Sequence, residues 1–386
     1  MRSVAVVGAG IAGLALALEL RRLGCPVTVI EARYPGAGNS TRNVGRVRRL
    51  QLTRDLTEFS CRATDKWRTV RRLTGGRNPL LYPTRYALAL YEEDEPAALA
   101  PMQRMWDECG ARARLVSTAE LLRAVPILEG GQRPVGGVLA EAAIVHHDAA
   151  VYAYFLAARE AGVAFRLDER AGDLERDGAC ATGIRTEAGE LIAAEAVVNA
   201  AGGASAALAR SWGIEVPNVP VRREVLVTEP RRPFMTAAVT FYRPQEGWFN
   251  QTLRGELVAG VVDPGEPEGL NESSSVRFLG RTARIVLAKA PRLGALQVVR
   301  QWAGVYDVTP DKRPLVGEYA GVRGAYALNG WSGRGILLAP LAADLLAREI
   351  AGLGRDGLLE SFAADRFAER TQQATIPADY YSGYAH

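Results

Sequence analysis

Residues 3–31 read SVAVVGAGIAGLALALELRRLGCPVTVIE, and this stretch decides the fold. The apolar run Val4–Val7 is typical of a buried parallel strand. An Ala- and Leu-rich segment follows three glycines and ends at Gly24, which is the pattern of a helix with a glycine at its C-terminus. A second apolar run, Val27–Ile30, ends at Glu31. The order strand, glycine turn, helix, strand predicts a dinucleotide-binding βαβ unit.

The three glycines of the turn have separate mechanical roles. Gly8 permits the tight turn from strand to helix, Gly10 lets the backbone approach a pyrophosphate, and Gly13 allows the helix to pack closely on the strand. The N-terminus of the helix offers N–H groups and the positive end of its dipole to phosphates. Glu31 can bind both ribose hydroxyls of an adenosine. A glycine-rich turn without a ligand is the alternative, and the motif does not choose between NAD and FAD.

The composition is that of an ordinary globular protein with room for two domains. The 386 residues are 48% hydrophobic and 23% charged. The net charge of +4 is small for this length, so we expect no nucleic-acid partner. The four cysteines form no Cys-x-x-Cys pair and indicate buried thiols in a reducing compartment, so no metal site is expected.

The sequence also bears on location. The first residues carry no secretory signal, because glycines interrupt the apolar run that starts at Val4. The longest apolar stretch, residues 335–350, is too short and too interrupted to span a bilayer. We therefore expect a cytoplasmic protein with no transmembrane segment.

Six blocks of sequence, collinear over residues 4–350, resemble one family of flavoenzymes. This family is the FAD-dependent amine oxidoreductases of the D-amino-acid oxidase, glycine oxidase and sarcosine oxidase group. The branch that the chain resembles most is the sarcosine oxidase β-subunit together with dye-linked proline dehydrogenase. The blocks are VVGAGIAGLALALEL, NSTRNVGRVRRLQ, IVHHDAAVYAYFLAAREAGV, AVVNAAGGAS, RQWAGVYDVTPDKRPLVG and NGWSGRGILLAPLAADLLA.

The resemblance implies an α/β fold with two domains. A discontinuous, Rossmann-like FAD-binding domain would comprise residues 1–78, 144–218 and 305–386. An α+β substrate domain with a mixed, largely antiparallel sheet would comprise residues 79–143 and 219–304. FAD would lie extended, with its adenosine at the end of the second strand.

The resemblance also assigns the FAD contacts residue by residue. The loop before the last long helix would direct N–H groups toward the flavin, and its positive helix end would stabilise the anionic reduced ring. The expected cofactor residues are Gly8, Gly10, Ile11, Ala12, Gly13, Glu31, Ala32, Arg33, Asn39, Ser40, Thr41, Arg42, Val44, Gly45, Ala200, Ala201, Gly202, Gly330, Ser332, Gly333, Arg334, Gly335 and Ile336.

Five arginines crowd residues 42–54, and the resemblance separates them. Arg48 matches the family pattern G-x-[VI]-R, whose arginine binds the substrate carboxylate in sarcosine oxidases. Arg49 is the alternative if the alignment is off by one residue. Arg42 would serve the cofactor region, whereas Arg46 and Arg54 have no assigned role and are expected to be solvated.

Three departures from the family pattern modify these expectations. Leu337 stands where sarcosine oxidases place a second carboxylate ligand, a lysine. Gly304 or Val305 replaces the cysteine that tethers FAD in monomeric sarcosine oxidases, so FAD should be non-covalent. The strand segment 255–262 lacks the oxygen-activating lysine of the oxidases, and Lys289 is predicted on a later helix. A dehydrogenase is therefore favoured over an oxidase.

The expected reaction is hydride transfer from an amino-acid substrate, first a secondary amine such as proline, hydroxyproline or sarcosine, to flavin N5, giving the imine. Tyr242 and Trp248 are candidate pocket walls, although such aromatics often belong to a core. His146 or His147 could carry a second flavin, FMN, or simply cap a helix with Asp148. No general base is evident.

Four alternatives remain open at this point. They are an amino-acid oxidase that makes hydrogen peroxide, a hydroxy-acid dehydrogenase on the same fold, a non-catalytic flavin-binding subunit, and a nicotinamide-linked Rossmann dehydrogenase. The electron acceptor would be a dye, a quinone or a partner subunit, and the sequence leaves open a homo- or hetero-oligomer.

Overall fold

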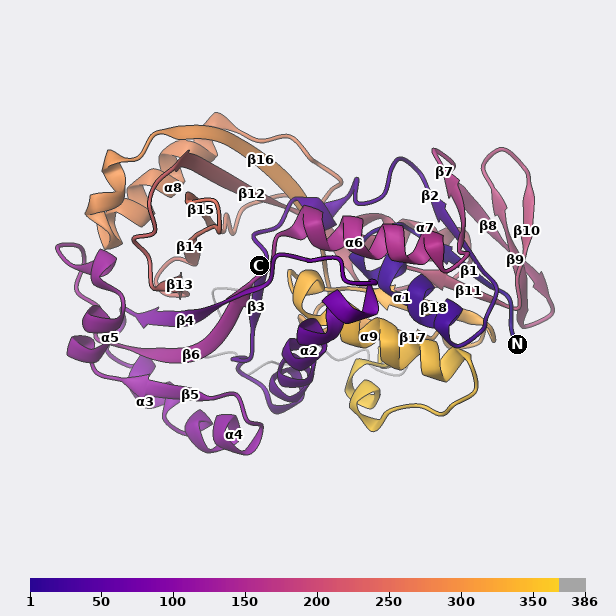
Figure 1. Cartoon of the computed structure of the whole chain (residues 1–386), viewed down its shortest axis with the longest axis horizontal. Helices are drawn as coiled ribbons and strands as arrows, with labels where there is room; N and C mark the ends of the chain where they lie inside the picture. Colours follow the sequence, from indigo (N-terminus) through magenta and orange to yellow (C-terminus); the bar gives the residue numbers. More distant parts are fainter. Residues whose placement is uncertain (368–386) are drawn as a thin grey trace.

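The computed structural model describes residues 1–367, so the last part of the expected FAD domain, residues 368–386, lies outside the described residues. The described chain is built on two large sheets, one on each side of Figure 1. This two-part architecture confirms the predicted α/β fold class.

A six-stranded sheet contains the predicted βαβ unit. β1 (Val4–Val7), α1 (Ile11–Arg22) and β2 (Val27–Glu31) follow one another as expected. β1 pairs in parallel with β2 on one side and with β11 on the other, so it is central. The sheet order is β17 (Leu315–Glu318), β18 (Ala325–Asn329), β11 (Ala196–Asn199), β1, β2 and β7 (Ala164–Leu167), and β17 alone is antiparallel to its neighbour.

Both faces of the central part of this sheet are buried, which explains why β1 is apolar at all four positions. Val4 and Val6 pack in one core with α1, while Ala5 and Val7 pack in another on the opposite face. The first core includes the helices α2 (Arg54–Leu73), α6 (His147–Glu160) and α9 (Gly335–Ile350). The second includes α7 (Ser205–Ser211) and a three-stranded sheet of β8 (Ala171–Asp177), β9 (Cys180–Thr186) and β10 (Leu191–Ala193).

A nine-stranded mixed sheet forms the other half of the molecule. Its order is β16 (Val298–Val308), β12 (Val219–Pro230), β15 (Glu256–Val261), β14 (Gly247–Gln251), β13 (Ala237–Phe241), β4 (Tyr82–Leu90), β6 (Gly136–Ile144) and β3 (Arg46–Arg48), with β5 (Ala113–Val116) paired to β6. The helices that accompany it are α3 (Glu95–Leu99), α4 (Met102–Glu108), α5 (Thr118–Ala124) and α8 (Val276–Lys289). The expected domain boundaries stay a prediction. They assign β3 to the FAD domain, whereas β3 pairs in the nine-stranded sheet.

Curvature brings the two ends of the nine-stranded sheet together, as Figure 1 shows. Arg46 on the edge strand β3 donates to Thr240 Oγ1 on β13 and to Asn250 Oδ1 on β14, both at 2.8 Å. At the opposite end of the sheet, Gly304 on β16 packs against Asn39, seven residues before Arg46 in the chain. The concave face of the sheet therefore closes around the segment that precedes β3.

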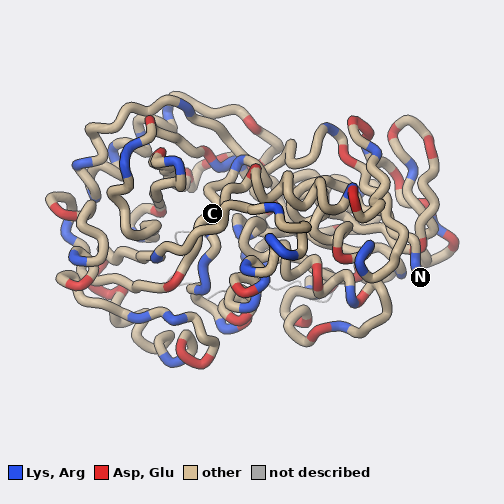
Figure 2. The backbone as a smooth tube through the Cα atoms, in the orientation of Figure 1, with Lys and Arg blue, Asp and Glu red and all other residues tan. Residues whose placement is uncertain are grey.

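Charge is spread over the molecule. Basic and acidic residues are interspersed along the chain rather than gathered on one element, as Figure 2 shows. Within residues 1–367, no helix combines the length and apolar character needed to cross a membrane.

Candidate active site

The predicted cofactor loops converge because of strand direction. β1, β2, β11 and β18 are parallel, so the segments that follow them meet at one edge of the sheet. The residues brought to this edge are Gly8, Gly10, Ile11, Ala12 and Gly13 after β1, Glu31, Ala32 and Arg33 at the end of β2, Ala200, Ala201 and Gly202 after β11, and Gly330 and Ser332 to Ile336 after β18.

The β1–α1 turn accepts only glycine at two positions. Gly8 has φ +107°, and a Cβ there would lie 2.5 Å from the carbonyl oxygen of Ala200. A Cβ on Gly13 would lie 1.9 Å from the carbonyl oxygen of Gly8. The turn is therefore pressed between the start of α1 and the loop after β11, which is the close packing that this glycine motif provides.

The start of α1 has the features of a phosphate site. No side chain caps it at Gly10, and its first turn holds no acidic residue. Ser40, from the short 3₁₀ helix Asn39–Thr41, accepts a hydrogen bond from Ile11 N at 2.9 Å. Glu31 accepts from Ala9 N at 2.8 Å, so its carboxylate is held at the tip of β2. A glycine-lined helix start with no capping side chain at Gly10, beside a fixed carboxylate, fits the pyrophosphate and ribose of FAD.

Two predicted cofactor arginines meet a carboxylate from the other half of the molecule. Glu272 accepts from both guanidinium nitrogens of Arg33 at 3.1 Å and from Arg42 at 2.7 Å. Arg33 and Arg42 also donate to the carbonyl oxygen of Ala37, at 2.9 and 2.8 Å. Glu272 therefore joins residues 263–275, the loop between β15 and α8, to the cofactor-side segment.

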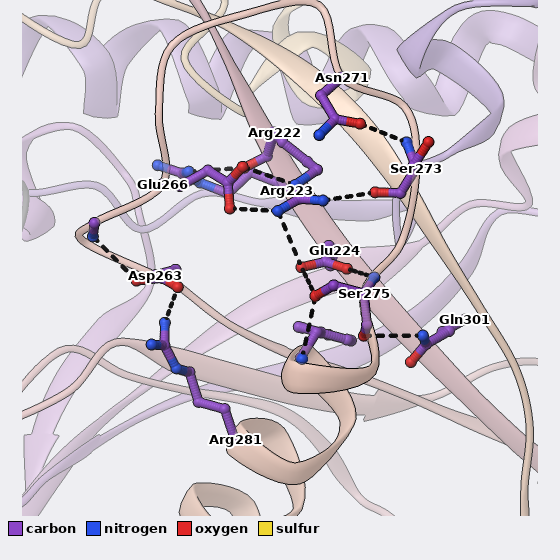
Figure 3. A network of polar contacts seen from close by, with 12 residues as sticks. Arg222, Arg223, Glu224, Asp263, Glu266, Asn271, Ser273, Ser275, Arg281 and Gln301 are labelled. Carbon is purple, nitrogen blue, oxygen red and sulfur yellow. Dashed lines mark hydrogen bonds and ion pairs between the residues drawn. The ribbon is translucent and has the colours of Figure 1, made fainter.

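The 263–275 loop is itself fixed by a polar network on β12 (Figure 3). Arg222 makes a two-pronged contact with Glu266, at 2.7 and 2.9 Å, and donates to the carbonyl oxygen of Ser273 at 2.8 Å. Glu224 accepts from the Ser275 hydroxyl at 3.1 Å, and Ser275 also caps α8. Because both ends of the loop are bound to β12, the position of Glu272 depends on the substrate-side sheet.

The glycine loop before α9 rests on a buried carboxyl group. Asp307 accepts from Gly330 N at 2.7 Å through its side chain and from Ser332 N at 3.1 Å through its backbone oxygen. Burial raises the pKa of Asp307 to about 7, although hydrogen bonds from the backbone act against the increase. Arg334, the residue before α9, donates to the carbonyl oxygen of Lys312 at 2.9 Å. This loop is thereby tied to the turn after β16.

A cavity of about 140 Å³ lies between this glycine loop, β3 and the curved sheet. Arg48 lines it, donates to the Tyr86 hydroxyl at 2.7 Å and to the Tyr242 hydroxyl at 3.5 Å, and stacks over the Tyr86 ring at 4.8 Å. Burial acts to raise the pKa of Tyr242, but Arg48 outweighs it and the pKa lies below its ordinary value. Leu337 and Trp248 also line this cavity.

Arg46 corrects one expectation, because it is not solvated. It is bound to Thr240, Asn250 and the carbonyl oxygen of Val239, and its guanidinium lies 5.0 Å from the Trp248 ring centroid. Burial lowers its pKa to about 10, which still leaves the side chain charged at neutral pH. The missed signal was the two-residue period of strand β3, which places Arg46 and Arg48 on the same face.

The other two arginines of the segment lie elsewhere. Arg49, the alternative carboxylate ligand, pairs with Asp65 on α2 and donates to the carbonyl oxygen of Gly110 at 3.4 Å. It is the first residue after β3, its side chain reaches α2, and it does not line the cavity. Arg54 forms an exposed ion pair with Glu108.

Several lining residues of the cavity had no predicted role. Sequence reasoning missed them because β12, the turn after β16 and the β13–β14 loop meet β3 only through the curvature of the sheet. Asn43 and Val44 line this cavity and also a larger one of about 480 Å³ on their other side. The unpredicted ionisable residues of the smaller cavity are Arg223, Glu224, Glu246, Tyr306 and Lys312.

The larger cavity contains the two histidines considered for FMN. Nδ1 of His146 accepts from Ala149 N at 3.4 Å and caps α6, and the His147 ring stacks on it at 5.4 Å. Burial lowers the pKa of His147. FMN attachment at either residue stays a prediction.

Two lysines bear on the reaction with oxygen, and they lie in different places. Lys289 ends α8 as predicted and is buried outside the cavity, with Nζ 3.3 Å from the Tyr91 ring centroid and 3.1 Å from Gln132 Oε1. Lys312, which sequence reasoning did not consider, lines the cavity. Burial lowers its pKa, and the nearby Arg223 lowers it further.

Comparisons with known proteins assign the chain to a family. Residues 3–349 match the model of one family, described as "DAO: FAD dependent oxidoreductase". The chain is 26% identical over 378 residues to the sarcosine oxidase subunit beta of Rhodobacter capsulatus, covering 95% of this chain and 88% of that protein. It is 27% identical over 384 residues to the glycine oxidase of Pseudomonas aeruginosa, covering 90% and 94% respectively.

Solved structures show the same fold. The L-proline dehydrogenase of P. horikoshii superposes with a TM-score of 0.88 at 23% identity, over 95% of this chain and 97% of that chain. The glycine oxidase of Geobacillus kaustophilus superposes with a TM-score of 0.84 at 22% identity, over 95% and 98%.

Proposed function

This chain belongs to the DAO family of FAD-dependent oxidoreductases, and from that premise we propose that it oxidises a secondary amino acid to the imine. The family makes it an enzyme that acts on amino acids or amines and binds FAD without a covalent bond. The observation that carries the narrower proposal is Arg48, held against Tyr86 and Tyr242 in a small cavity beside the glycine loop of α9.

When bound, FAD supplies the acceptor for a hydride. The C–H bond at the substrate α-carbon breaks with its electron pair, the nitrogen lone pair forms the C=N bond, and an N–H proton leaves. The chain's own part is to bind and orient. Arg48 binds the substrate carboxylate, and Tyr86 and Tyr242 fix the direction of its guanidinium. Trp248 and Leu337 provide apolar walls that exclude water.

Glu246 is the best placed group for the substrate amine. It lines the cavity from the loop between β13 and β14, and its negative charge raises the pKa of Tyr306 and of Lys312. A carboxylate near the reacting nitrogen would favour an ammonium on entry and accept its proton before hydride transfer. Glu246 therefore takes the role for which the sequence offered no candidate.

A dye, a quinone or a partner subunit is the proposed electron acceptor. The supporting observation is that β15 carries no lysine and that Lys289 packs on Tyr91 outside the cavity. The residue that would favour oxygen instead is Lys312. The name of the R. capsulatus relative, a subunit beta, supports a partner subunit for this chain as well.

Anaerobic bleaching of the bound flavin tests the proposal. The purified holoprotein is mixed with D- and L-proline, hydroxyproline, sarcosine and the corresponding 2-hydroxy acids. The absorbance of the oxidised flavin at about 450 nm is then followed. Reduction by an amine and not by a hydroxy acid is expected. Bleaching by none of the amines would discard the proposal and favour a non-catalytic flavin subunit.

The acceptor is tested on the same sample. Reoxidation of the reduced protein by an artificial dye should be faster than reoxidation by oxygen with release of hydrogen peroxide. If oxygen is the faster acceptor in the native protein and Lys312→Met slows only that step, the chain is an oxidase.

A further inference from the structure

The small cavity is unusually basic for the site of a neutral amino acid. Among the described residues that line it, six are basic and two are acidic. The basic residues are Arg42, Arg46, Arg48, Arg223, Lys312 and Arg334, and the acidic residues are Glu224 and Glu246. Arg42 is paired with Glu272, and one substrate carboxylate takes one or two cations, so the lining still carries more positive charge than the proposed reaction requires.

These cations lie on two walls that come from opposite ends of the nine-stranded sheet. Arg48 belongs to β3, the last strand at one edge. Arg223 belongs to β12, which neighbours the strand β16 at the other edge, and Lys312 follows β16 in the turn before β17. Curvature of the sheet brings these walls to the same cavity.

The two walls have separate polar surroundings. Arg48 acts on Tyr86 and Tyr242, donating a hydrogen bond to each hydroxyl. On the other wall the guanidinium of Arg223 lies 5.7 Å from the Tyr306 ring centroid and donates to the carbonyl oxygen of Arg222 at 2.9 Å. Arg223 and Arg334 both act electrostatically on Lys312, so these three cations form one basic group.

Glu246 lines the same cavity, from the loop between β13 and β14. Its charge acts on Tyr242 on the Arg48 side and on Tyr306 and Lys312 on the other side. The lining thus combines the Arg48 cation, a carboxylate and a second basic group. A ligand that matches this lining has an anionic group, an amine and a second anionic group.

We propose that the substrate is an amino acid with a second acidic group, whose α-carboxylate binds Arg48 and whose other acid binds Lys312 and Arg223. This inference rests on the proposed oxidation of an amino acid at this site. The second acid sits on the side chain or on the nitrogen substituent, and the amine between the two acids faces Glu246. Arg46 also lines the cavity and adds positive charge from strand β3.

The expected preference for a diacid over its monoamide follows from unequal costs of desolvation. A buried cation loses hydration that a matching acid restores, whereas a neutral amide of the same shape restores less. Glutamate should therefore reduce the flavin with a kcat/KM about 10- to 100-fold higher than glutamine, and iminodiacetate should exceed its monoamide by a similar factor.

Anaerobic flavin reduction by these matched pairs is the first measurement. Both enantiomers of aspartate, asparagine, glutamate and glutamine are compared, together with iminodiacetate, its monoamide, sarcosine and proline. In parallel, the dissociation constants of succinate and succinamate are measured from perturbation of the oxidised flavin spectrum. Faster reduction by the diacid of each pair, and tighter binding of succinate, is the expected result.

Substitution of the second wall is the second measurement. Lys312→Met and Arg223→Met should raise KM for the diacid by about tenfold or more and change KM for the monoacid much less. The matched control is Arg104→Met, because the Arg104 side chain is 90% exposed on α4. This control should keep the preference of the native protein. A thermal melt of each variant checks that it is folded.

Three outcomes would overturn the inference. If glutamine or sarcosine is the better substrate, the second acid is not recognised, while amino-acid oxidation itself stands. If no amine reduces the flavin, the proposed function fails, and equal dissociation constants for succinate and succinamate then also reject a diacid site. If Lys312→Met lowers kcat equally for both substrate classes and lowers the flavin potential, these cations serve the cofactor instead.

Discussion

The arginines on the cofactor side of the molecule and those in the substrate cavity differ in what they bind. Arg33 and Arg42 share the carboxylate of Glu272. Arg46 and Arg48 instead donate to hydroxyl, amide and carbonyl oxygens of the surrounding strands. All four come from the same 16-residue stretch, 33–48, so composition alone does not separate them.

The difference shows how one chain prepares arginines for two purposes. An arginine that is paired with a carboxylate has its charge balanced and holds two segments together. An arginine that tyrosine, threonine and asparagine side chains hold on the wall of a cavity is directed toward that cavity, where it attracts an anionic ligand. The separation is sharp between neighbours, because Arg49, the residue after β3, is bound to Asp65 and does not line the cavity.

Replacing Arg48 should have the largest effect on activity. Arg48→Met removes the proposed carboxylate ligand from a buried site, so kcat/KM should fall about 10²- to 10⁴-fold, as expected for the loss of one buried charge partner. FAD content should stay near that of the native protein. Steady-state kinetics with the best amine and the flavin absorbance of the purified variant provide the measurements.

The matched control is Arg49→Met, at the residue that follows β3. It loses the Asp65 contact, so thermal stability should decrease while kcat/KM changes less than about tenfold. If Arg49→Met instead removes activity and Arg48→Met does not, the comparison between these two neighbouring arginines is wrong.

Two carboxyl groups, Glu272 and Asp307, differ in the same way as the arginines. Burial acts to raise the pKa of Glu272, but Arg33 and Arg42 outweigh it and the pKa lies below its ordinary value. Burial raises the pKa of Asp307 to about 7, and the partners of its side chain are backbone N–H groups. The folded protein therefore binds a proton at Asp307 more tightly than the unfolded chain does.

The free energy of unfolding should consequently fall as the pH rises through the range in which Asp307 titrates. The contribution of Asp307 is fully present below about pH 4 and is lost as the pH rises through about 7, with a slope of at most about 1.4 kcal/mol per pH unit. Asp307→Asn should flatten this slope while keeping an acceptor for Gly330 N. Thermal melts between about pH 4 and pH 8 measure it.

An exposed carboxyl group serves as the control for this pH effect. The Arg243 guanidinium lowers the pKa of Asp94, so Asp94→Asn should leave the slope in this window unchanged. A slope in Asp307→Asn equal to that of the native protein would show that Asp307 does not titrate there.

The smallest expected effect concerns Glu272. Glu272→Gln weakens a partly exposed contact worth about 0.2–1 kcal/mol per ion pair, so the dissociation constant of FAD should rise about two- to fivefold. Titration of the apoprotein with FAD, followed by flavin fluorescence, measures the change, and high salt should reduce the difference. Glu141→Gln, which breaks the exposed pair with Arg112 elsewhere, is the control. An unchanged dissociation constant in Glu272→Gln would mean that the 263–275 loop does not affect cofactor retention.

Sequence alone predicted the parts of the protein that are built locally. The βαβ unit follows from contiguous residues, and Gly13 packs on Gly8 of the same turn, whereas the contact of Gly8 with Ala200 comes from a distant segment. The family resemblance then supplied the FAD-dependent class, which the family match confirms. The position of Leu337 in the cavity also agrees with the alignment that replaced a lysine by this residue.

The cavity itself could not be predicted in the same way. Arg223 and Lys312 lie more than 170 residues after Arg48, and they meet it only because the sheet curves. Periodicity does not encode that curvature, whereas it does encode the common face of Arg46 and Arg48. The cavity was missed because curvature is a property of the tertiary structure. The common face of Arg46 and Arg48 was missed although their spacing in the sequence encodes it.

The strand order of the six-stranded sheet has a consequence for how the protein is made. β1 is flanked by β2 and by β11, and α1 packs against α9 near the end of the described chain. The residues predicted to bind FAD run from Gly8, before α1, to Ile336, in α9. During synthesis the N-terminal glycine turn emerges first, yet it has no complete binding site until α9 has left the ribosome. Cofactor loading is thus a late step of biogenesis, and the apolar face of α1 needs protection until then.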